Sequence, residues 1–236
     1  MAGHSKWANI KHKKAKEDAL RGKAFTKLVK EITVCARESG DLHNNPRLRT
    51  LVDKAKQINM PQENIKRAIQ KGTGELPGVA YEKHMYEGYG PGGIAVMVEM
   101  LTDNKNRAVA ELRHVFSKKG GNLGETGTVN WMFSMKGVIK ATGSLSEDDL
   151  LEKLLDYDVE NISKQDDSFI ITCELKALEG VKKAVLDAGL SIESAEVEWV
   201  AKDLVTPPAD QEEKAIDFLE ALDELDDIQN VYSNIG

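Results

Sequence analysis

Cysteine is scarce in this sequence of 236 residues, and the residue clusters that build metal or nucleophile sites are missing. There are two cysteines, Cys35 and Cys173, without a C-x-x-C pair, so we expect no disulfide framework and a reducing compartment. The five histidines do not stand at metal-ligand spacing, and there is no G-x-S-x-G elbow. We therefore predict no metal, no cofactor and no enzymatic activity, although a catalytic pair assembled only in the folded chain would leave no such motif.

Long apolar runs are also missing from the sequence. The stretch Gly88–Val98 has no charge, but it is about half of the ~20 apolar residues that a membrane-spanning helix needs. The bases at the N-terminus are not followed by the apolar segment of a secretory signal. The sequence thus predicts no membrane partner and a cytoplasmic location.

Two glycine-rich segments are candidates for ligand loops. "GYGPGGI" lies between two predicted strands and lacks the lysine of a phosphate-binding loop, so a structural turn is the favoured interpretation. "KKGGNLGETG" follows a predicted helix and indicates a helix end with a surface loop. In this loop Lys118, Lys119 and Asn122 are candidates for ligand contact.

Charge is divided unevenly along the chain. The total is −7, but residues 1–71 hold 17 Lys and Arg against 7 Asp and Glu, a net charge of +10. Residues 72–236 hold 15 against 32, a net charge of −17. Such asymmetry indicates that the N-terminal part binds a polyanion and that the remainder has a different task.

The N-terminal part, residues 1–75, has the apolar spacing of three amphipathic helices. Apolar residues recur at helical intervals over residues 25–36. A second helix begins at Pro46 with Asn45 as its N-cap, and a third ends at Gly72. Three helices of this length suit a small bundle.

Beyond residue 75 the pattern changes to alternating strands and helices, with strands expected at 126–134 and 136–143. Residues 135–203 follow the order strand–helix–strand–strand–helix–strand, which is the ferredoxin-like split βαβ order. Residues 76–134 give a second, incomplete unit, which the helix and strand of residues 204–236 complete. We therefore predict an α+β fold: an N-terminal three-helix domain followed by two ferredoxin-like α+β domains, one inserted into the other.

The basic N-terminal arm is the main candidate for a functional site. Residues 1–30 carry nine bases and two acids, too few local acids to neutralise the bases by internal salt bridges. Phosphate binding with counterion release would relieve their repulsion, and Trp7 and His12 offer faces on which a base could stack. The predicted nucleic-acid-binding residues are Lys6, Trp7, Lys11, His12, Lys13, Lys14, Lys16, Arg21, Lys23, Lys27 and Lys30.

Two other roles for the arm are less consistent with its composition. A solubilising tail would gain nothing from an exposed Trp7, and a membrane-surface helix would need a bulky apolar face that the arm lacks. Because the arm lies outside the apolar stripes, we expect that replacing Trp7 by Ala, or Lys11, Lys13 and Lys14 together by Ala, leaves folding unaffected. The acidic helix predicted within residues 210–227 is interpreted as a solvated face over an apolar stripe, or else as a docking surface for a basic partner.

Several long strings in this sequence resemble the YebC family, and the resemblance runs essentially from end to end. They are "MAGHSKWANIKHKK", "RGKAFTKLVKEIT", "NPRLRTLVDKAKQINMP", "YEGYGPGGIAV", "LTDNKNRAVAELRHVFSKKGGNLG" and "GTVNWMF". The resemblance implies a cytoplasmic protein with a helical N-terminal domain and two α+β domains, without enzyme activity or cofactor. The family carries two functional labels: a DNA-binding transcriptional regulator, and a translation factor acting at the ribosome, as with the mitochondrial relative that activates cytochrome oxidase synthesis.

Together these patterns predict a non-enzymatic nucleic-acid-binding regulator of gene expression, with DNA or ribosomal RNA as its partner and the ribosome as a further candidate. No helix-turn-helix with base-reading residues is evident, which weakens sequence-specific promoter recognition. The alternative is a ligand-sensing or hydrolytic protein that uses the cleft between the α+β domains.

Overall fold

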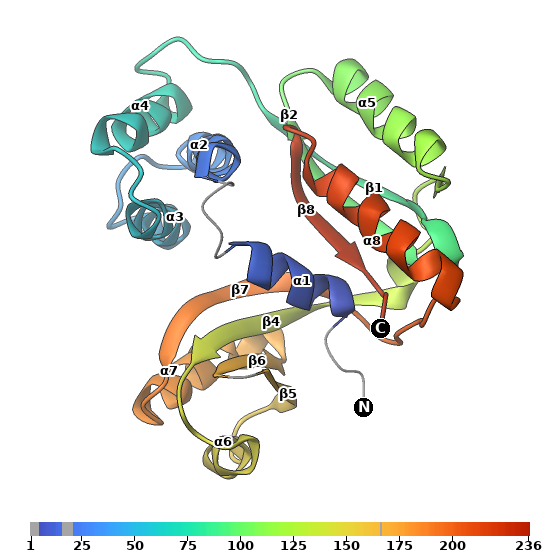
Figure 1. The fold of residues 1–236 in the computed structure, drawn as a ribbon. Helices are drawn as coiled ribbons and strands as arrows, with labels where there is room; N and C mark the ends of the chain where they lie inside the picture. The colour runs from blue at the N-terminus through green and yellow to red at the C-terminus, as the bar shows by residue number, and fades with distance from the viewer. Residues whose placement is uncertain (1–4, 16–20, 166) are drawn as a thin grey trace.

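The structure, a computed structural model, describes residues 5–15, 21–165 and 167–236. It contains a helical unit and two mixed units, each built on a four-stranded sheet (Figure 1). The predicted α+β class, with helices first and sheet domains after them, is confirmed. The helices are α1 (Lys6–Ala15), α2 (Arg21–Cys35), α3 (Pro46–Gln57), α4 (Gln62–Thr73), α5 (Lys105–Lys118), α6 (Glu147–Leu154), α7 (Leu178–Asp187) and α8 (Ala209–Asp223). The strands are β1 (Glu82–Tyr89), β2 (Ala95–Thr102), β3 (Asn122–Leu123), β4 (Phe133–Thr142), β5 (Val159–Gln165), β6 (Ser168–Cys173), β7 (Ser191–Ala201) and β8 (Ile228–Ser233).

The helices α2, α3 and α4 form a bundle around one apolar core. Asn45 caps α3 by accepting a hydrogen bond from the Leu48 N–H at 3.0 Å, and Pro46 is the first helical residue. Gly72 lets α4 approach α2 closely, because an added Cβ there would lie 2.4 Å from the carbonyl oxygen of Thr33. The apolar spacing therefore predicted this bundle correctly.

The first sheet has the strand order β3-β1-β2-β8, and α5 and α8 cover one of its faces (Figure 1). The strands β1 and β2 form an antiparallel hairpin, and β8 from the end of the chain pairs antiparallel with β2. The rings of Phe116 on α5 and Phe218 on α8 meet edge to face at 4.9 Å in the core beneath these helices. The C-terminal segment thus completes a sheet that begins at residue 82.

The second sheet has the strand order β5-β6-β4-β7, with α6 and α7 packed on one face. Neighbouring strands are antiparallel, which is the arrangement of a split βαβ unit. The predicted domain boundary at residue 135 falls inside β4, near its start. The two strands predicted at 126–134 and 136–143 are replaced by a single strand, because Ser134 and Met135 continue the ladder opposite Val200 and Trp199 without a turn.

A buried carboxylate shapes the loop that precedes β4. Glu87 on β1 accepts hydrogen bonds from the backbone N–H groups of Gly127 at 3.0 Å, Val129 at 2.8 Å and Asn130 at 2.9 Å. Burial would raise the pKa of Glu87, but these three hydrogen bonds lower it below the ordinary value. The valine and aromatic residues here are typical of a strand, and the local pattern contains no sign of the distant carboxylate that folds them into a loop.

The segment "GYGPGGI" is the turn between β1 and β2, as the sequence predicted. Gly92 and Gly93 adopt φ values of 72° and 76°, which favour glycine. An added Cβ at Gly90 would lie 2.8 Å from the ring of Phe218, and one at Gly92 would lie 2.6 Å from Pro207. The small residues therefore allow α8 and the segment before it to pack over the turn.

Candidate nucleic-acid interface

Part of the predicted arm falls outside what the structure describes. Lys16 lies outside the described residues. The backbone of α1 continues to Ala15 and α2 begins at Arg21. The side chains of Lys11, His12, Lys13, Lys14 and Arg21 also lie outside the described part of the chain, so their predicted role stays a prediction.

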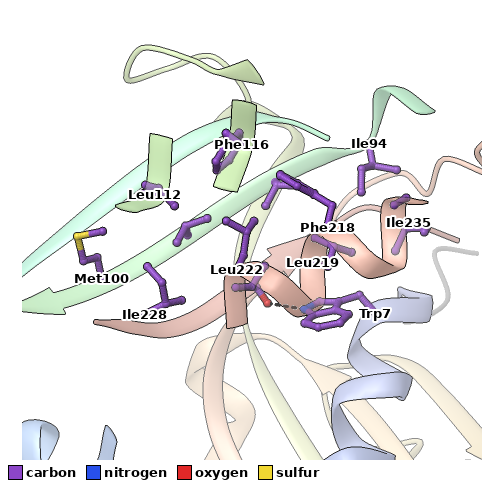
Figure 2. Packing of buried hydrophobic residues seen from close by; sticks show 14 of the residues in the cluster. Trp7, Ile94, Met100, Leu112, Phe116, Phe218, Leu219, Leu222, Ile228 and Ile235 are labelled. Atoms are coloured by element: carbon purple, nitrogen blue, oxygen red, sulfur yellow. Dashed lines mark hydrogen bonds between the residues drawn. The ribbon is translucent and has the colours of Figure 1, made fainter. Parts of the chain in front are cut away.

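Trp7 is not the exposed stacking residue that the sequence predicted. Its side chain is 3% exposed and belongs to the core of the first α+β unit. Figure 2 shows it beneath α8, with the indole N–H donating a hydrogen bond to the carbonyl oxygen of Val231 at 2.9 Å. The N–H of Lys6 also donates to the carbonyl oxygen of Ile235 at 2.8 Å. Because β8 is an edge strand, α1 covers an edge that would otherwise expose unpaired backbone groups.

The first turn of α1 also makes an ion pair with α8. The ammonium of Lys6 contacts the carboxylate of Glu212, far away in the sequence. Together with Trp7, this contact makes α1 a structural part of the first α+β unit. The expectation that replacing Trp7 leaves folding unaffected is inconsistent with the burial of its side chain in this core.

Three predicted phosphate-binding lysines of α2 are used inside the molecule. Lys23 and Lys27 donate to the carbonyl oxygens of Glu224 and Asp223 at 3.2 and 3.3 Å, and Lys27 also pairs with the Asp223 carboxylate at 3.0 Å. These acceptors lie at the C-terminal end of α8, where the helix dipole favours cations. For Lys6, Lys27 and Lys30, the prediction that internal salt bridges do not account for the bases is wrong, because their acidic partners come from the other end of the chain.

The contacts of α2 with the end of α8 and the segment after it form a junction between the bundle and the first α+β unit. Lys30 is the most buried of its three lysines, with a side chain 8% exposed. Its ammonium contacts the Asp227 carboxylate at 2.6 Å and the carbonyl oxygen of Asp226 at 2.8 Å. The other carboxylate oxygen of Asp227 accepts from the Arg107 guanidinium at 2.8 Å and from the Thr102 hydroxyl at 3.0 Å. Burial would raise the pKa of Asp227, but the hydrogen bonds from Arg107 and Lys30 lower it. Asp227 therefore joins α2 to the beginning of α5.

This junction gives the acidic C-terminal helix a role. The sequence left open whether the helix is a solvated face or a docking surface for a basic partner. Its end binds the basic α2 of the same chain, while Phe218, Leu219 and Leu222 fill the core beneath it (Figure 2). A contact between residues so distant in sequence leaves no local pattern from which it could have been found.

The outer surface of the helical bundle retains basic side chains. Arg47 at the start of α3 and Lys66, Arg67 and Lys71 on α4 are exposed. Arg67 lies 3.9 Å from Glu63, a loose contact between two exposed side chains. The bundle therefore keeps exposed positive charge on α3 and α4.

A second basic surface, which the sequence indicated only through Lys118 and Lys119, lies on α5. Lys105, Arg113, His114, Lys118 and Lys119 are all exposed there. Charge spacing on a helix that had already been predicted would have been sufficient to find this face. Asn122, the third candidate of that loop, is exposed at the short strand β3.

Trp131 is a further residue that sequence reasoning missed. Its side chain is 61% exposed, on the loop that Glu87 holds in place. The indole N–H donates to the Thr128 carbonyl oxygen at 3.2 Å, and Lys202 donates to the Trp131 carbonyl oxygen at 2.8 Å. The sequence placed this residue inside a strand and so gave no reason to expect it on the surface.

A small cavity lies between the two α+β units, beside α1. Ser5, Trp7 and Ala8 of the N-terminal segment, with residues of β4, β7 and β8, line a cavity of about 50 Å³. Small-molecule sites usually enclose about 300–1,000 Å³. This cavity by itself is smaller than such a site, and the alternative function stays a prediction.

Acidic residues also gather where the bundle meets the two sheets, each near a lysine. Lys54 contacts Glu196 at 2.5 Å, and Lys140 contacts Glu198 at 3.1 Å. Burial raises the pKa of Glu31 nearby, and the charge of Lys54 partly opposes this shift. Within residues 5–15, 21–165 and 167–236, no group of three or more metal-ligating side chains is found.

The two cysteines are buried and unpaired with each other. Burial raises the pKa of Cys173 to about 11, and it also raises that of Cys35, so both thiols stay protonated near neutral pH. No helix in the described part of the chain is both long and apolar enough to cross a membrane.

Comparisons with known proteins match the whole length of this architecture. The chain is 50% identical over 236 residues to a probable transcriptional regulatory protein of Koribacter versatilis, covering 100% of this chain and 95% of the relative. It is 53% identical to a probable transcriptional regulatory protein of Nitrosococcus oceani, covering 99% and 95%. A crystal structure of a conserved hypothetical protein from Aquifex aeolicus superposes with a TM-score of 0.85 at 45% identity, covering 94% of this chain and 93% of that one.

Two family models divide the chain as the structure does. Residues 5–75 match the TACO1/YebC protein N-terminal domain, which includes α1 and the bundle. Residues 81–235 match the TACO1/YebC second and third domain, which includes both sheets. With full-length relatives at about half identity and models that together cover nearly the whole chain, this protein belongs to the TACO1/YebC family.

Proposed function

We propose that this protein is a non-enzymatic regulator of gene expression that acts by binding nucleic acid. The observation that carries the proposal is the concentration of positive charge at one end of an acidic chain, a net +10 over residues 1–71 within a total of −7. Positive charge gathered on one surface is the usual electrostatic signature of a nucleic-acid-binding protein.

The structure narrows the part of this charge that is free for a partner. Lys23, Lys27 and Lys30 bind the end of α8 or the segment after it, and Lys6 binds Glu212, so each of these four lysines already has a partner within the molecule. The positive charge that remains for a partner comes from the arm residues between Lys11 and Arg21 and from the exposed basic side chains of α3 and α4. Such groups position a backbone and read no sequence, so the proposed binding is of low sequence specificity.

The relatives' names support regulation as the task. The proteins of Koribacter versatilis and Nitrosococcus oceani are named probable transcriptional regulatory proteins. We propose DNA as the target on this basis, with ribosomal RNA in a ribosome-associated translation factor as the second candidate. The absence of a base-reading motif is the feature that favours the second.

Charge removal in the arm tests the proposal. Replacing Lys11, Lys13 and Lys14 together by Ala should make the slope of log affinity against log salt shallower by about 2.7 for duplex DNA and about 2.1 for a single strand. Affinity should fall about equally on every sequence. A matched control replaces the exposed Lys153, Lys176 and Lys183 of the inserted unit by Ala, with the same change in net charge. Fluorescence anisotropy over a salt series gives both slopes, and equal slopes for the two variants would contradict the proposal.

A second experiment separates the two targets. Sedimentation of cell lysate through a sucrose cushion measures whether the intact protein travels with ribosomes, with and without the three arm substitutions. Ribosome association that the arm variant loses and the control variant keeps would identify the ribosome as the target. Recovery of the wild-type protein with DNA, and not with ribosomes, would identify duplex DNA as the target.

The non-enzymatic part of the proposal has its own test. We expect purified protein to hold no stoichiometric metal and to hydrolyse no nucleotide. Nucleotide turnover that persists through purification and is lost after a point substitution would overturn it.

A further inference from the structure

The helix α5 stands out in the acidic part of the chain by the sign of its charge. Of the four α-helices that the structure describes beyond residue 82, α5 alone contains more basic than acidic residues. Residues 105–119 hold five Lys and Arg against one acid, Glu111. The surrounding sequence from 72 to 236 has a net charge of −17. Of the other three helices, α6 and α8 are acidic and α7 is balanced, so the basic charge of α5 needs a separate explanation.

The basic side chains of α5 are not needed to hold the fold together, with one exception. Arg113, Lys118 and Lys119 are exposed, and none forms a side-chain hydrogen bond or ion pair with another residue in the described ranges. Among the described basic side chains of this helix, only Arg107 forms ion pairs within the molecule, with Asp103 at 3.0 Å and with Asp227 at 2.8 Å. The lysines of α2 differ from these bases, because each of them donates hydrogen bonds to acceptors within the molecule.

The helix presents these bases on a rigid support. Asn104 caps it by accepting from the Arg107 N–H at 3.1 Å. Ala108, Leu112 and Phe116 on its inner face are buried in the core. From Lys105 to Lys118 the exposed bases extend over roughly 20 Å at the α-helical rise, enough to meet several phosphates of a duplex.

We propose that the outer face of α5 is a second phosphate-binding surface, which contacts the backbone of duplex DNA. This inference rests on the proposed function. The carboxylate of Asp227 binds both Lys30 of α2 and Arg107 of α5, so the junction holds α5 at a fixed position relative to the bundle. The proposed duplex contacts α5 in addition to the arm and the bundle.

The side chains between the bases favour a duplex as the occupant. Asn106, Ala110 and Ser117 are small and exposed, so a broad backbone can approach along the helix. Single-stranded nucleic acid is typically held by aromatic side chains on which unpaired bases stack. The outer face of α5 carries no Phe, Tyr or Trp, whereas a duplex keeps its bases stacked internally and needs none.

Removing three charges from this face tests the inference on the full-length protein. Arg113, Lys118 and Lys119 are replaced together by Ala, and the matched control again replaces Lys153, Lys176 and Lys183. Binding to mixed-sequence duplex DNA and to single-stranded RNA of the same length is measured by fluorescence anisotropy over a salt series. We expect the salt slope for duplex DNA to become shallower by about 2.7 in the α5 variant, with little change in the control. Thermal unfolding of both variants checks that the fold is retained.

The possible results separate this inference from the proposed function. Wild-type binding with equal slopes in the α5 and control variants would overturn the α5 surface and leave the proposed function standing. A loss confined to single-stranded RNA would overturn the assignment to a duplex. Failure of the wild type to bind either nucleic acid would overturn both proposals together.

Discussion

The helices α2 and α5 are both basic, and they meet at the same carboxylate, yet they use their charges in opposite ways. The lysines at positions 23, 27 and 30 of α2 face inward and end on α8 and the segment after it. On α5, Arg113 and Lys118 face solvent, and only Arg107 binds within the molecule. A basic run in a sequence is therefore not the same as a basic surface, because distant acids decide which charges remain free.

The difference also shows what the N-terminal segment does for the fold. Trp7 and Lys6 attach α1 to β8 and α8, and the lysines of α2 then attach the bundle to the end of α8. The charge asymmetry of the chain is thus partly used as an internal attraction between its two ends. We predict that disrupting these internal contacts lowers stability, whereas removing charge from α5 changes only binding.

The largest effect on stability is expected from Trp7→Ala. The side chain is 3% exposed and donates a hydrogen bond to Val231, so its loss leaves a cavity and an unpaired carbonyl. The free energy of unfolding, measured by urea denaturation, should fall by about 3–5 kcal/mol. Trp131→Ala is the matched control, because its side chain is 61% exposed and should change stability by about 0.5 kcal/mol or less. Equal effects of the two substitutions would contradict the structural role of Trp7.

Lys30→Ala is expected to have the next largest effect. It removes hydrogen bonds to the Asp227 carboxylate and to two carbonyl oxygens, in a place where the lysine side chain is only 8% exposed. Hydrogen bonds to charged groups contribute about 1.5–3 kcal/mol, and urea denaturation should reveal a loss of that size. Lys56→Ala serves as the control, since Lys56 is 54% exposed in its pair with Asp53. A loss no greater than that of the control would show that Arg107 alone satisfies Asp227.

Much of the fold could be predicted from the sequence, because most helices and strands depend on local patterns. Asn45 and Pro46 mark the start of α3, and the glycines after Tyr89 mark a turn. The loop before β4 escaped prediction because the carboxylate of Glu87 fixes its backbone from β1. Local propensity describes a residue and its neighbours, and it contains no information on a remote hydrogen-bond acceptor.

The candidate site was less predictable than the fold for the same reason. The distribution of charge along the sequence correctly placed positive charge at one end, but it could not say that Asp223 and Asp227 would bind Lys27 and Lys30. The bases around Trp7 marked it as part of a polar arm, although β8 and α8 bury it. Both errors concern contacts between the first and last segments of the chain.

Acid should weaken the junction through Asp227. Its pKa is held below the ordinary value of about 3.9 by Arg107 and Lys30, although burial opposes this shift. A carboxylate with a lowered pKa contributes stability above that ordinary value and loses it as pH falls through the folded-state pKa. The difference in unfolding free energy between wild type and Asp227→Asn should therefore be constant at neutral pH and shrink below about pH 4. A difference that does not depend on pH would show that Asp227 is not ionised in the native state.

The smallest effect is expected from Lys27→Ala, which tests the more exposed part of the same junction. The two side chains of its pair with Asp223 are 20% and 26% exposed, so water and salt screen the attraction more than they do at Lys30. The substitution should cost about 1 kcal/mol or less, and the cost should decrease as salt is added. The cost of Lys30→Ala should respond much less to salt, because its partner is buried with it. Urea denaturation of both variants at low and high salt measures the two dependences side by side. An equal response would mean that the bundle is held to α8 by exposed charge alone, in which case a bound polyanion would compete for the lysines of α2 as readily as for the bases of α5.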